Sequence, residues 1–267
     1  MYTFSKLAWT ISIIFTVLII LYVIYTSIET SLEHEGEEIV IEESEILLPL
    51  PRKYTNLSVE EAILYRRSIR EYASEPITMY ELSMILWAAQ GITDTKYGFR
   101  SAPSAGATYP LEIYIVVGNN TVLVDKNTFL EAGVYKYNVY KHSIVLVKKG
   151  DYRNQLSKAA LDQEWVKKAA VDIVICAVYE RTTNRYGERG IRYVHMEAGH
   201  VGQNIYLMAT ALDLGTVAVG AFHDDQVAEI IGAGAEEHPL YIMPIGRLVI
   251  PYKTSFEEIN DFYKGNR

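Results

Sequence analysis

Apolar positions between about residue 57 and about residue 251 follow two different periods. Spacings of three and four residues, as on one face of a helix, alternate with short runs of Val, Ile, Leu and Tyr that are typical of strands. The helical spacing predicts helices over residues 58–65, 78–90, 151–168 (as one helix or two), 191–214 and 223–231. The apolar runs predict strands over residues 112–117, 134–138, 143–148, 172–179, 216–222 and 240–245. Helices and strands are mixed, and two neighbouring strands have the pattern of a hairpin, so we predict an α+β fold with one sheet flanked by helices.

Local signals refine these elements. Ser58 with Glu61, and Thr78 with Glu81, have the spacing of a capping box and predict two helix starts. The fourth predicted strand is apolar nearly throughout, which indicates a central strand covered on both faces. Pro244 interrupts the last strand. Because proline cannot donate to a strand ladder, we expect an edge position or a strand end there.

An uncharged apolar stretch, residues 7–28, precedes this region. About 20 apolar residues span the hydrocarbon core of a bilayer. Trp9, Tyr22 and Tyr25 lie near the two ends, where aromatic rings favour the interface. A cleaved signal peptide has a shorter apolar core and a small-residue cleavage site, so we predict a retained single-pass membrane anchor with the lipid bilayer as partner. Lys6 precedes the stretch, and the positive-inside rule favours an outside location for the domain, although the acidic residues that follow do not settle the side.

Eight glutamates and no Lys or Arg follow within residues 29–45. Acidic runs repel themselves and stay extended, so we predict a linker over residues 29–56. Removing these eight leaves 33 − 8 = 25 acidic residues against 25 basic ones, so the net charge of −8 belongs to the linker. We assign residues 1–28 to the anchor, residues 57–251 to one domain of usual size, and residues 252–267 to a C-terminal tail.

The composition excludes several classes of protein. With 49% hydrophobic residues the chain is not disordered, and with one cysteine, Cys176, it is not a disulfide-built scaffold. The lack of a basic excess excludes nucleic acid as a partner. No dinucleotide-binding, P-loop or nucleophile-elbow motif is present. His195 and His200 are five residues apart on a predicted helix and do not share a face, so we predict no metal site.

Three segments carry candidate chemistry. Residues 66–70 (RRSIR) combine arginines with a hydroxyl, which either binds a phosphate or forms a solvated basic turn. Residues 101–110 (SAPSAGATYP) form a rigid loop of small residues that a flat ring can approach closely. On the longest predicted helix Glu197, His200 and Asn204 make one polar stripe, which is either a structural network or the wall of a site.

These segments occur in a familiar order. RRSIR, APSAGATYPLEIY, RYVHMEAGHVGQN on the long helix, LDLGTVAVGAF and the terminal PIGR together resemble the nitroreductase superfamily, and within it most the SagB-type, thiazoline-oxidising dehydrogenases. The resemblance covers residues 57–247. It implies an FMN-binding α+β fold with a mixed sheet, in which two subunits interlock as a homodimer and each flavin lies at their interface.

The resemblance also implies which residues hold the flavin. The phosphate would be bound by the arginine cluster and a C-terminal arginine, namely Arg66, Arg67, Ser68, Arg70, Gly246 and Arg247. The ring would lie against a loop, a strand turn and a polar side chain, namely Pro103, Ser104, Ala105, Gly106, Gly220, Ala221 and Gln163. The catalytic residues stay unknown, with Tyr193 and His200 as the candidates for proton transfer.

We therefore expect an FMN-dependent oxidoreductase that transfers a hydride between flavin N5 and a small molecule or a peptide heterocycle, the latter as SagB-type enzymes do. One alternative is an NAD(P)H-dependent reductase of nitro or quinone compounds. Another is a flavin-binding scaffold subunit without turnover. A membrane anchor is unusual beside these typically soluble enzymes, and it indicates a substrate near or in the membrane.

Overall fold

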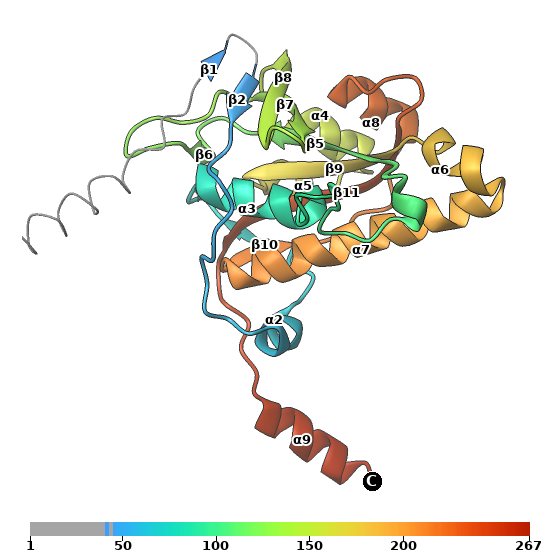
Figure 1. The fold of residues 1–267 in the computed structure, drawn as a ribbon. Coiled ribbons are helices and arrows are strands. Elements are labelled where there is room, and N and C mark those ends of the chain that lie inside the picture. The colour runs from blue at the N-terminus through green and yellow to red at the C-terminus, as the bar shows by residue number, and fades with distance from the viewer. Residues whose placement is uncertain (1–40, 43–44) are drawn as a thin grey trace, which may run out of the picture. The chain divides into compact units, whose positions relative to one another are not determined.

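The structure is a computed structural model that describes residues 41–42 and 45–267 (Figure 1). The membrane anchor that we predict at residues 7–28 lies outside the described residues. Within the described part of the chain, no helix is both long enough and apolar enough to cross a membrane.

Nine of the described strands form one sheet, in the order β1-β2-β8-β7-β5-β9-β11-β10 with β3 beside β11. Their bounds are β1 (Ile41–Glu42), β2 (Glu45–Leu47), β3 (Tyr72–Ala73), β5 (Leu111–Val117), β7 (Gly133–Asn138), β8 (Ser143–Lys149), β9 (Val171–Ala177), β10 (Leu214–Thr216) and β11 (His238–Leu248). Neighbouring strands in this sheet are antiparallel. A parallel pair, β4 (Ile77–Thr78) with β6 (Val122–Leu123), stands apart from it. The α+β fold class is confirmed.

Helices cover both faces of this sheet (Figure 1). They are α2 (Val59–Tyr65), α3 (Met79–Gln90), α4 (Arg153–Ala159), α5 (Glu164–Lys168), α6 (Glu180–Tyr186), α7 (Arg189–Ala211), α8 (Asp224–Ile231) and α9 (Phe256–Gly265), with the short 3-10 turn η1 (Ala105–Ala107). On one face Tyr114 and Val174 pack with Leu156 of α4, Val166 of α5 and Val227 of α8. The alternate residues of these strands point to the other face, where α3 and α7 pack against each other (Figure 1).

Strand β9 is the centre of the sheet. All seven of its residues are buried, and it lies between β5 and β11, which confirms the prediction of a central strand covered on both faces. Both predicted capping boxes are also present. Ser58 and Glu61 start α2, and Thr78 and Glu81 start α3, each pair exchanging side-chain and backbone hydrogen bonds.

The strand predicted over residues 216–222 is wrong in extent. Strand β10 ends at Thr216, and beyond it an isolated bridge joins Val219 to Ile242. The apolar run here is buried by packing rather than by a continuous ladder, because Val217 and Val219 belong to the core on the α4 and α8 face.

The expectation that Pro244 marks an edge or a strand end is also wrong, because β11 continues through it between β9 and β10. The ladder toward β10 is interrupted at this point, since pairing stops at Ile245 and resumes at Ile242. The Pro244 carbonyl accepts a hydrogen bond from the Tyr72 hydroxyl at 3.2 Å instead. Proline therefore loses no ladder bond here.

The segments that we assigned to the linker and the tail contain regular structure. Strand β2 pairs with β8, and Glu45, the last acidic residue of the run, accepts hydrogen bonds from Lys141 and Ser143 at 2.7 Å each. Helix α9 starts at a capping box of Ser255 and Glu258. None of its residues is buried, and it extends away from the sheet (Figure 1).

Candidate functional site

Three arginines in the turn after α2 have no carboxylate partner among the described residues. Each guanidinium instead lies over an aromatic ring: Arg66 over Tyr206 at 5.2 Å, Arg67 over Tyr252 at 3.9 Å and Arg70 over Trp165 at 5.4 Å from the ring centroid. Arg67 also donates to the Tyr252 hydroxyl at 2.7 Å. Stacking orients a guanidinium without neutralising it, so the turn keeps positive charge for an external anion.

The arginine turn is attached to the segment that follows β10. Ser68 Oγ is 3.0 Å from Tyr206 Oη, which accepts from the backbone N–H of Ala218 at 2.8 Å. The backbone N–H of Ile69 donates to the Thr216 carbonyl at 2.9 Å. Tyr206, on the last turns of α7, thus serves both as the ring under one arginine and as the link to the second segment.

That second segment contains Gly220 and Ala221, which are both exposed. Their backbone N–H groups have no hydrogen-bond partner among the described residues. Gln163 Nε2 donates to the carbonyl oxygens of Ala221 at 3.0 Å and of Ala160 at 2.8 Å. The structure thus brings together Gln163, the Gly220–Ala221 turn and the arginine turn, three of the segments that the resemblance assigns to one site.

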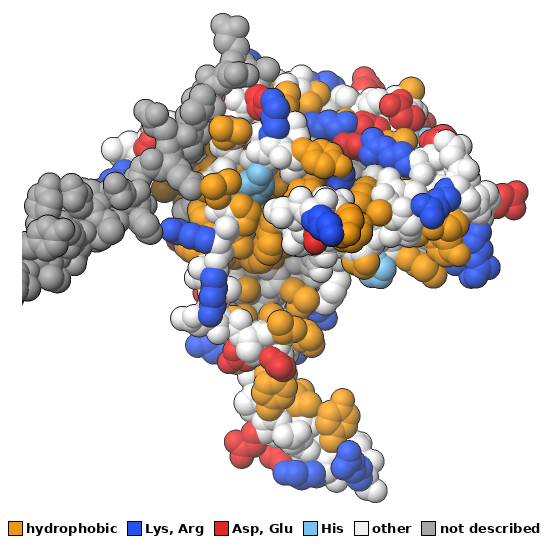
Figure 2. All heavy atoms as spheres, in the orientation of Figure 1, with side chains coloured by type: hydrophobic (Ala, Val, Ile, Leu, Met, Phe, Trp, Pro, Cys, Tyr) orange, Lys and Arg blue, Asp and Glu red, His pale blue; other side chains and the backbone are white. Residues whose placement is uncertain are grey.

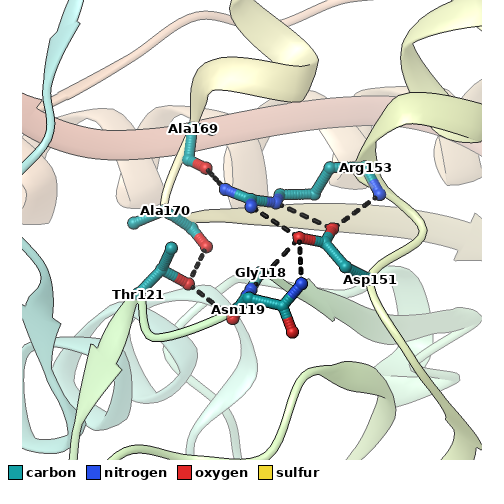
Figure 3. Close-up of polar contacts among 7 residues, drawn as sticks. All are labelled: Gly118, Asn119, Thr121, Asp151, Arg153, Ala169 and Ala170. Carbon is teal, nitrogen blue, oxygen red and sulfur yellow. Dashed lines mark hydrogen bonds and ion pairs between the residues drawn. The ribbon is translucent and has the colours of Figure 1, made fainter.

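A largely buried arginine holds the outer ends of the helix pair α4–α5 (Figure 3), and Gln163 lies in the connection between these two helices. Arg153, at the start of α4, donates to Asp151 through Nε at 2.9 Å and Nη2 at 2.6 Å. Its Nη1 donates to the Ala169 carbonyl, just after α5, at 2.5 Å. The guanidinium lies against Gly118, where an added Cβ would come within 2.0 Å of Arg153 Cζ. Arg153 therefore ties both ends of the α4–α5 pair to the turn after β5.

The loop of residues 101–110 has a strained backbone. The φ angle is +61° at Gly106, +53° at Ala107 and +44° at Tyr109. Positive φ at non-glycine residues costs about 1–3 kcal/mol each and persists only when the surroundings enforce it. Across the turn Ser104 Oγ accepts from the backbone N–H of Tyr109 at 2.9 Å.

Helix α6 anchors the outer side of this loop. Arg185 donates to the Gly106 carbonyl at 3.2 Å, and Arg181 donates to the Tyr109 carbonyl at 3.1 Å. A Cβ at Gly106 would come within 2.5 Å of Tyr186 Oη. Pro103 is exposed beside them, and Ser104 and Ala105 are half-buried. Among the described residues of one chain, no hydrogen bond joins this loop to the arginine turn or to the Gly220–Ala221 turn.

Arg247 and Gly246 have structural partners of their own. Arg247 binds Glu81 through Nη1 at 2.8 Å and Nη2 at 2.9 Å, and Nη2 also donates to the Pro76 carbonyl at 3.1 Å. Strand β11 pairs with β3 at this point, so the backbone of Arg247 runs beside the end of the arginine turn while its guanidinium is engaged at α3. Gly246 lies against the Tyr72 side chain, whose Cβ, Cγ and Cδ1 atoms would be 2.7–2.9 Å from an added Cβ.

The candidates on α7 face different surroundings. Tyr193 is half-buried, with its ring 5.2 Å from that of Tyr186 in an edge-to-face arrangement. His200 is exposed. Glu197 is buried, and Asn204 donates to the backbone of the 101–110 loop at 3.4 Å. The polar stripe is therefore not one wall: its ends support the loop, and its middle faces outward.

A cavity of about 390 Å³ opens beside the arginine turn, between the end of α7 and the C-terminal segment. Arg67 and Lys253 both line it, as does Thr216, whose buried hydroxyl has no hydrogen-bond partner in the described structure. Beside Arg70, the buried Nε1 of Trp165 is also without a partner there. The sequence reasoning missed Lys253, Trp165 and Tyr206, because none of them belongs to a motif.

Comparisons with known proteins agree on one family. The nitroreductase family model matches residues 63–247. The chain is 50% identical over 197 residues to MJ1384 of Methanocaldococcus jannaschii, a protein with a nitroreductase name, covering 72% of this chain and 92% of that protein. It is 25% identical over 196 residues to the trifolitoxin operon protein TfxC of Rhizobium leguminosarum bv. trifolii, covering 70% of this chain and 54% of that protein. The crystal structure of a protein from Ralstonia eutropha JMP134, described as a nitroreductase, matches with a TM-score of 0.66 at 26% identity, covering 78% of this chain and 91% of that one.

Proposed function

Because the chain belongs to the nitroreductase family, whose members are generally oxidoreductases and typically bind FMN, we propose that it is an FMN-dependent oxidoreductase. The observation that carries the proposal is the turn of Arg66, Arg67 and Arg70, three cations without a carboxylate partner among the described residues. FMN has one phosphate and a flat ring, and when bound it supplies the hydride chemistry. The protein's part is to bind, orient and shield it.

The residues of the turn fit a phosphate. Guanidinium groups and the Ser68 hydroxyl donate charge-assisted hydrogen bonds to phosphate oxygens. Lys253 lines the same cavity as Arg67, and we propose it as the additional cation at this end of the site. Since both Nη atoms of Arg247 bind Glu81, we propose that Arg247 and its neighbour Gly246 act indirectly, by fixing the strand beside the turn.

The exposed turn of Gly220 and Ala221 fits the flavin ring. Its two unpartnered N–H groups can donate toward a ring that gains negative charge on reduction. Gln163 is held beside it by the Ala221 carbonyl. Leu161 and Asp162, directly before Gln163, have φ angles of +58° and +57°. Backbone strain at non-glycine residues gathers at functional positions, which supports a site here.

The loop of Pro103, Ser104, Ala105 and Gly106 would complete the site from a second subunit. Within one chain no described hydrogen bond joins it to the other segments, and its strained, anchored backbone is suited to a flat ring. We therefore place the site at the interface of a homodimer, with the arginine turn from one chain and the loop from its partner. Tyr193 and His200 stay the candidates for proton transfer to a substrate.

Exposed apolar side chains support the homodimer. Val59 and Ile63 on α2, and Phe262 and Tyr263 on α9, each keep at least 57% of their surface exposed. Apolar side chains gather over α9 in Figure 2. A helix of ten residues is marginal in water without tertiary packing, so a partner surface is expected to cover it.

Two substrate classes follow from the similarities. The resemblance to SagB-type dehydrogenases and the similarity to a trifolitoxin operon protein favour oxidation of a peptide heterocycle. The 50% identical relative with a nitroreductase name favours reduction of a small electrophile by NAD(P)H. In both reactions FMN, when bound, would supply the hydride chemistry, and the chain's own residues would hold and orient it. Mixing the protein with NADH or NADPH without oxygen decides between them, because only the reductase bleaches its flavin rapidly with a nicotinamide donor. A flavin that no donor or heterocycle reduces would indicate a scaffold subunit.

We further propose that residues 7–28 anchor the domain to a membrane and that the acidic linker keeps it near the bilayer surface. The positive-inside rule favours the outer side. Full-length protein is expected to stay with membranes after an alkaline wash, whereas a chain that lacks residues 1–28 should be released. Release of the full-length protein by the wash would contradict the anchor.

The test of FMN binding uses full-length protein in mild detergent. The purified protein should show the visible absorption of oxidised flavin, or should acquire it when FMN is added. Arg66→Ala combined with Arg70→Ala removes two charge-assisted contacts of about 1.5–3 kcal/mol each, so affinity should fall by more than about 100-fold. Lys126→Ala, which removes one positive charge at an exposed turn, is the control and should bind as the wild type does. Wild-type affinity in the arginine variant would place the phosphate elsewhere.

A further inference from the structure

A buried carboxyl lies under the strained loop. Glu197 is on α7 and only 3% exposed. Its carboxyl faces the side chain of Gln90, at the end of α3, and that of Ser104 in the loop, and it lies within the field of Arg100. Gln90 is fully buried, and its Oε1 accepts a hydrogen bond from Arg100 Nη1 at 3.1 Å. The four side chains form one polar cluster between α3, α7 and the loop.

The fold alone does not account for this cluster. Oε1 of Glu197, Nε2 of Gln90 and Nε of Arg100 are all buried without a hydrogen-bond partner among the described residues. Partly satisfied polar clusters destabilise a core relative to apolar side chains of similar size. A carboxyl kept in such a place points to a role other than stability.

The cluster continues into the backbone of the loop. Ser104, which faces Glu197, accepts from the N–H of Tyr109 at 2.9 Å. The Tyr109 hydroxyl accepts from the N–H of Arg100 at 3.2 Å, and the Arg100 guanidinium lies 4.5 Å from the Tyr109 ring centroid. These contacts close around Gly106 and Ala107, two of the residues with positive φ. Glu197 is therefore connected, through two side chains, to the strained part of the loop.

We propose that Glu197 is the positioning residue that holds the 101–110 loop in its strained conformation and thereby sets how tightly the flavin is bound. The inference rests on the proposed function, since the loop is where a second subunit would meet the flavin ring. Glu197 would not touch the ring itself. It acts through Ser104 and Arg100.

The role predicts a dependence on pH. Burial raises the pKa of Glu197 to about 7, although Ser104, Gln90 and Arg100 oppose the shift. Among the described residues the charge acting on Glu197 is that of Arg100. The group from α3 is the neutral amide of Gln90, and α6 presents Tyr186 to the same loop. When Glu197 ionises, its attraction to the Ser104 hydroxyl and to Arg100 grows. The loop should therefore be held more tightly above pH 7 than below it.

The experiment compares full-length wild type with Glu197→Gln, which keeps the shape but cannot ionise, and Glu197→Leu, which removes the polar group. Glu188→Gln, an exposed carboxylate before α7, is the matched control. FMN affinity is measured by fluorescence quenching from acid to mildly alkaline pH. Amide hydrogen exchange of residues 99–110 is measured without flavin, and thermal stability is recorded for each variant.

Wild type and Glu188→Gln should gain about tenfold in affinity in a one-proton step near pH 7, beyond the change caused by the phosphate of FMN itself. Glu197→Gln should lack this step. In Glu197→Leu the amides of the loop should exchange faster, and the variant should bind FMN more weakly than wild type. Its melting temperature should equal that of wild type or be higher. A structural role would instead lower stability and affinity together.

The proposal is overturned if Glu197→Gln keeps the wild-type pH step, or if neither variant changes exchange in residues 99–110. If Glu197→Leu fails to fold, the comparison of wild type with Glu197→Gln decides alone. If no protein binds FMN but loop exchange in wild type still slows through pH 7 and that of Glu197→Gln does not, the proposed function fails and the positioning role stands.

Discussion

Asp172 offers a quantitative test of the fold, independent of any ligand. It is the second residue of β9, opposite Val116 of β5 and Pro244 of β11, and it is fully buried. Neither carboxyl oxygen has a hydrogen-bond partner among the described residues. Burial raises the pKa of Asp172 well above its usual range, and the nearby Arg153 only partly opposes the shift. Burial therefore favours the neutral form of this carboxyl in the folded protein.

The size of the effect follows from proton linkage. An unfolded Asp loses its proton near pH 3.9, so keeping it protonated at pH 7 costs about three pH units at about 1.4 kcal/mol each, or up to about 4 kcal/mol. Because the folded pKa is raised, this cost is absent below the unfolded pKa and grows as pH rises from the unfolded pKa toward the folded pKa. Asp172→Asn has nearly the same shape and an equally unpartnered polar group, but no proton to hold.

Asp172→Asn should therefore be more stable than wild type by up to about 4 kcal/mol at pH 7, or about 10 °C in Tm, with the difference vanishing near pH 4. Thermal unfolding followed by circular dichroism across this range measures both. The exposed Glu75→Gln, in the turn before β4, is the control and should leave stability unchanged at both pH values. A variant no more stable than wild type at pH 7, or a difference independent of pH, would refute a buried neutral carboxyl.

Three further predictions follow from the same contacts. Gly118→Ala puts a Cβ within 2.0 Å of Arg153 Cζ and should lower the free energy of unfolding by about 3 kcal/mol. Added to the Arg153→Ala variant, Gly118→Ala should lower the free energy of unfolding only slightly further, and a double-mutant cycle followed by thermal unfolding measures this difference. Gly106→Ala, at a φ of +61° and 2.5 Å from Tyr186 Oη, should weaken FMN binding about tenfold or more with an unchanged circular dichroism spectrum. Phe262→Ser on α9 should shift the protein from dimer toward monomer in light scattering, and an unchanged mass would mean that α9 does not contribute to the interface.

Most of the fold could be predicted because burial repeats with the period of each element. The capping boxes at Ser58 and Thr78 and the apolar run of β9 are local signals, and the structure confirms them. The path of β11 through Pro244 could not be predicted, since it depends on a break in the neighbouring ladder. Helix α9 could have been predicted, because Ser255 with Glu258 has the spacing of a capping box.

The sequence predicted only part of the candidate site. The motifs predicted the arginine turn and Gln163, and the structure brings their segments together. The partner of Arg247 depends on which helix start lies beside β11. No spacing in the sequence predicts that both Nη atoms of Arg247 donate to Glu81. Lys253 lines the cavity from a polar tail without a motif. Tertiary register, rather than local pattern, decides both positions.

We propose that one FMN site is built from the arginine turn of one chain and the 101–110 loop of another. A complementation experiment tests this shared site, using the Arg66→Ala, Arg70→Ala variant and the Gly106→Ala variant, each of which should bind FMN weakly alone. When the two are unfolded and refolded together, mixed dimers should regain one tight FMN site, formed by the intact turn of one chain and the intact loop of the other. A mixture that binds no more FMN than the sum of its parts would contradict a site shared between chains.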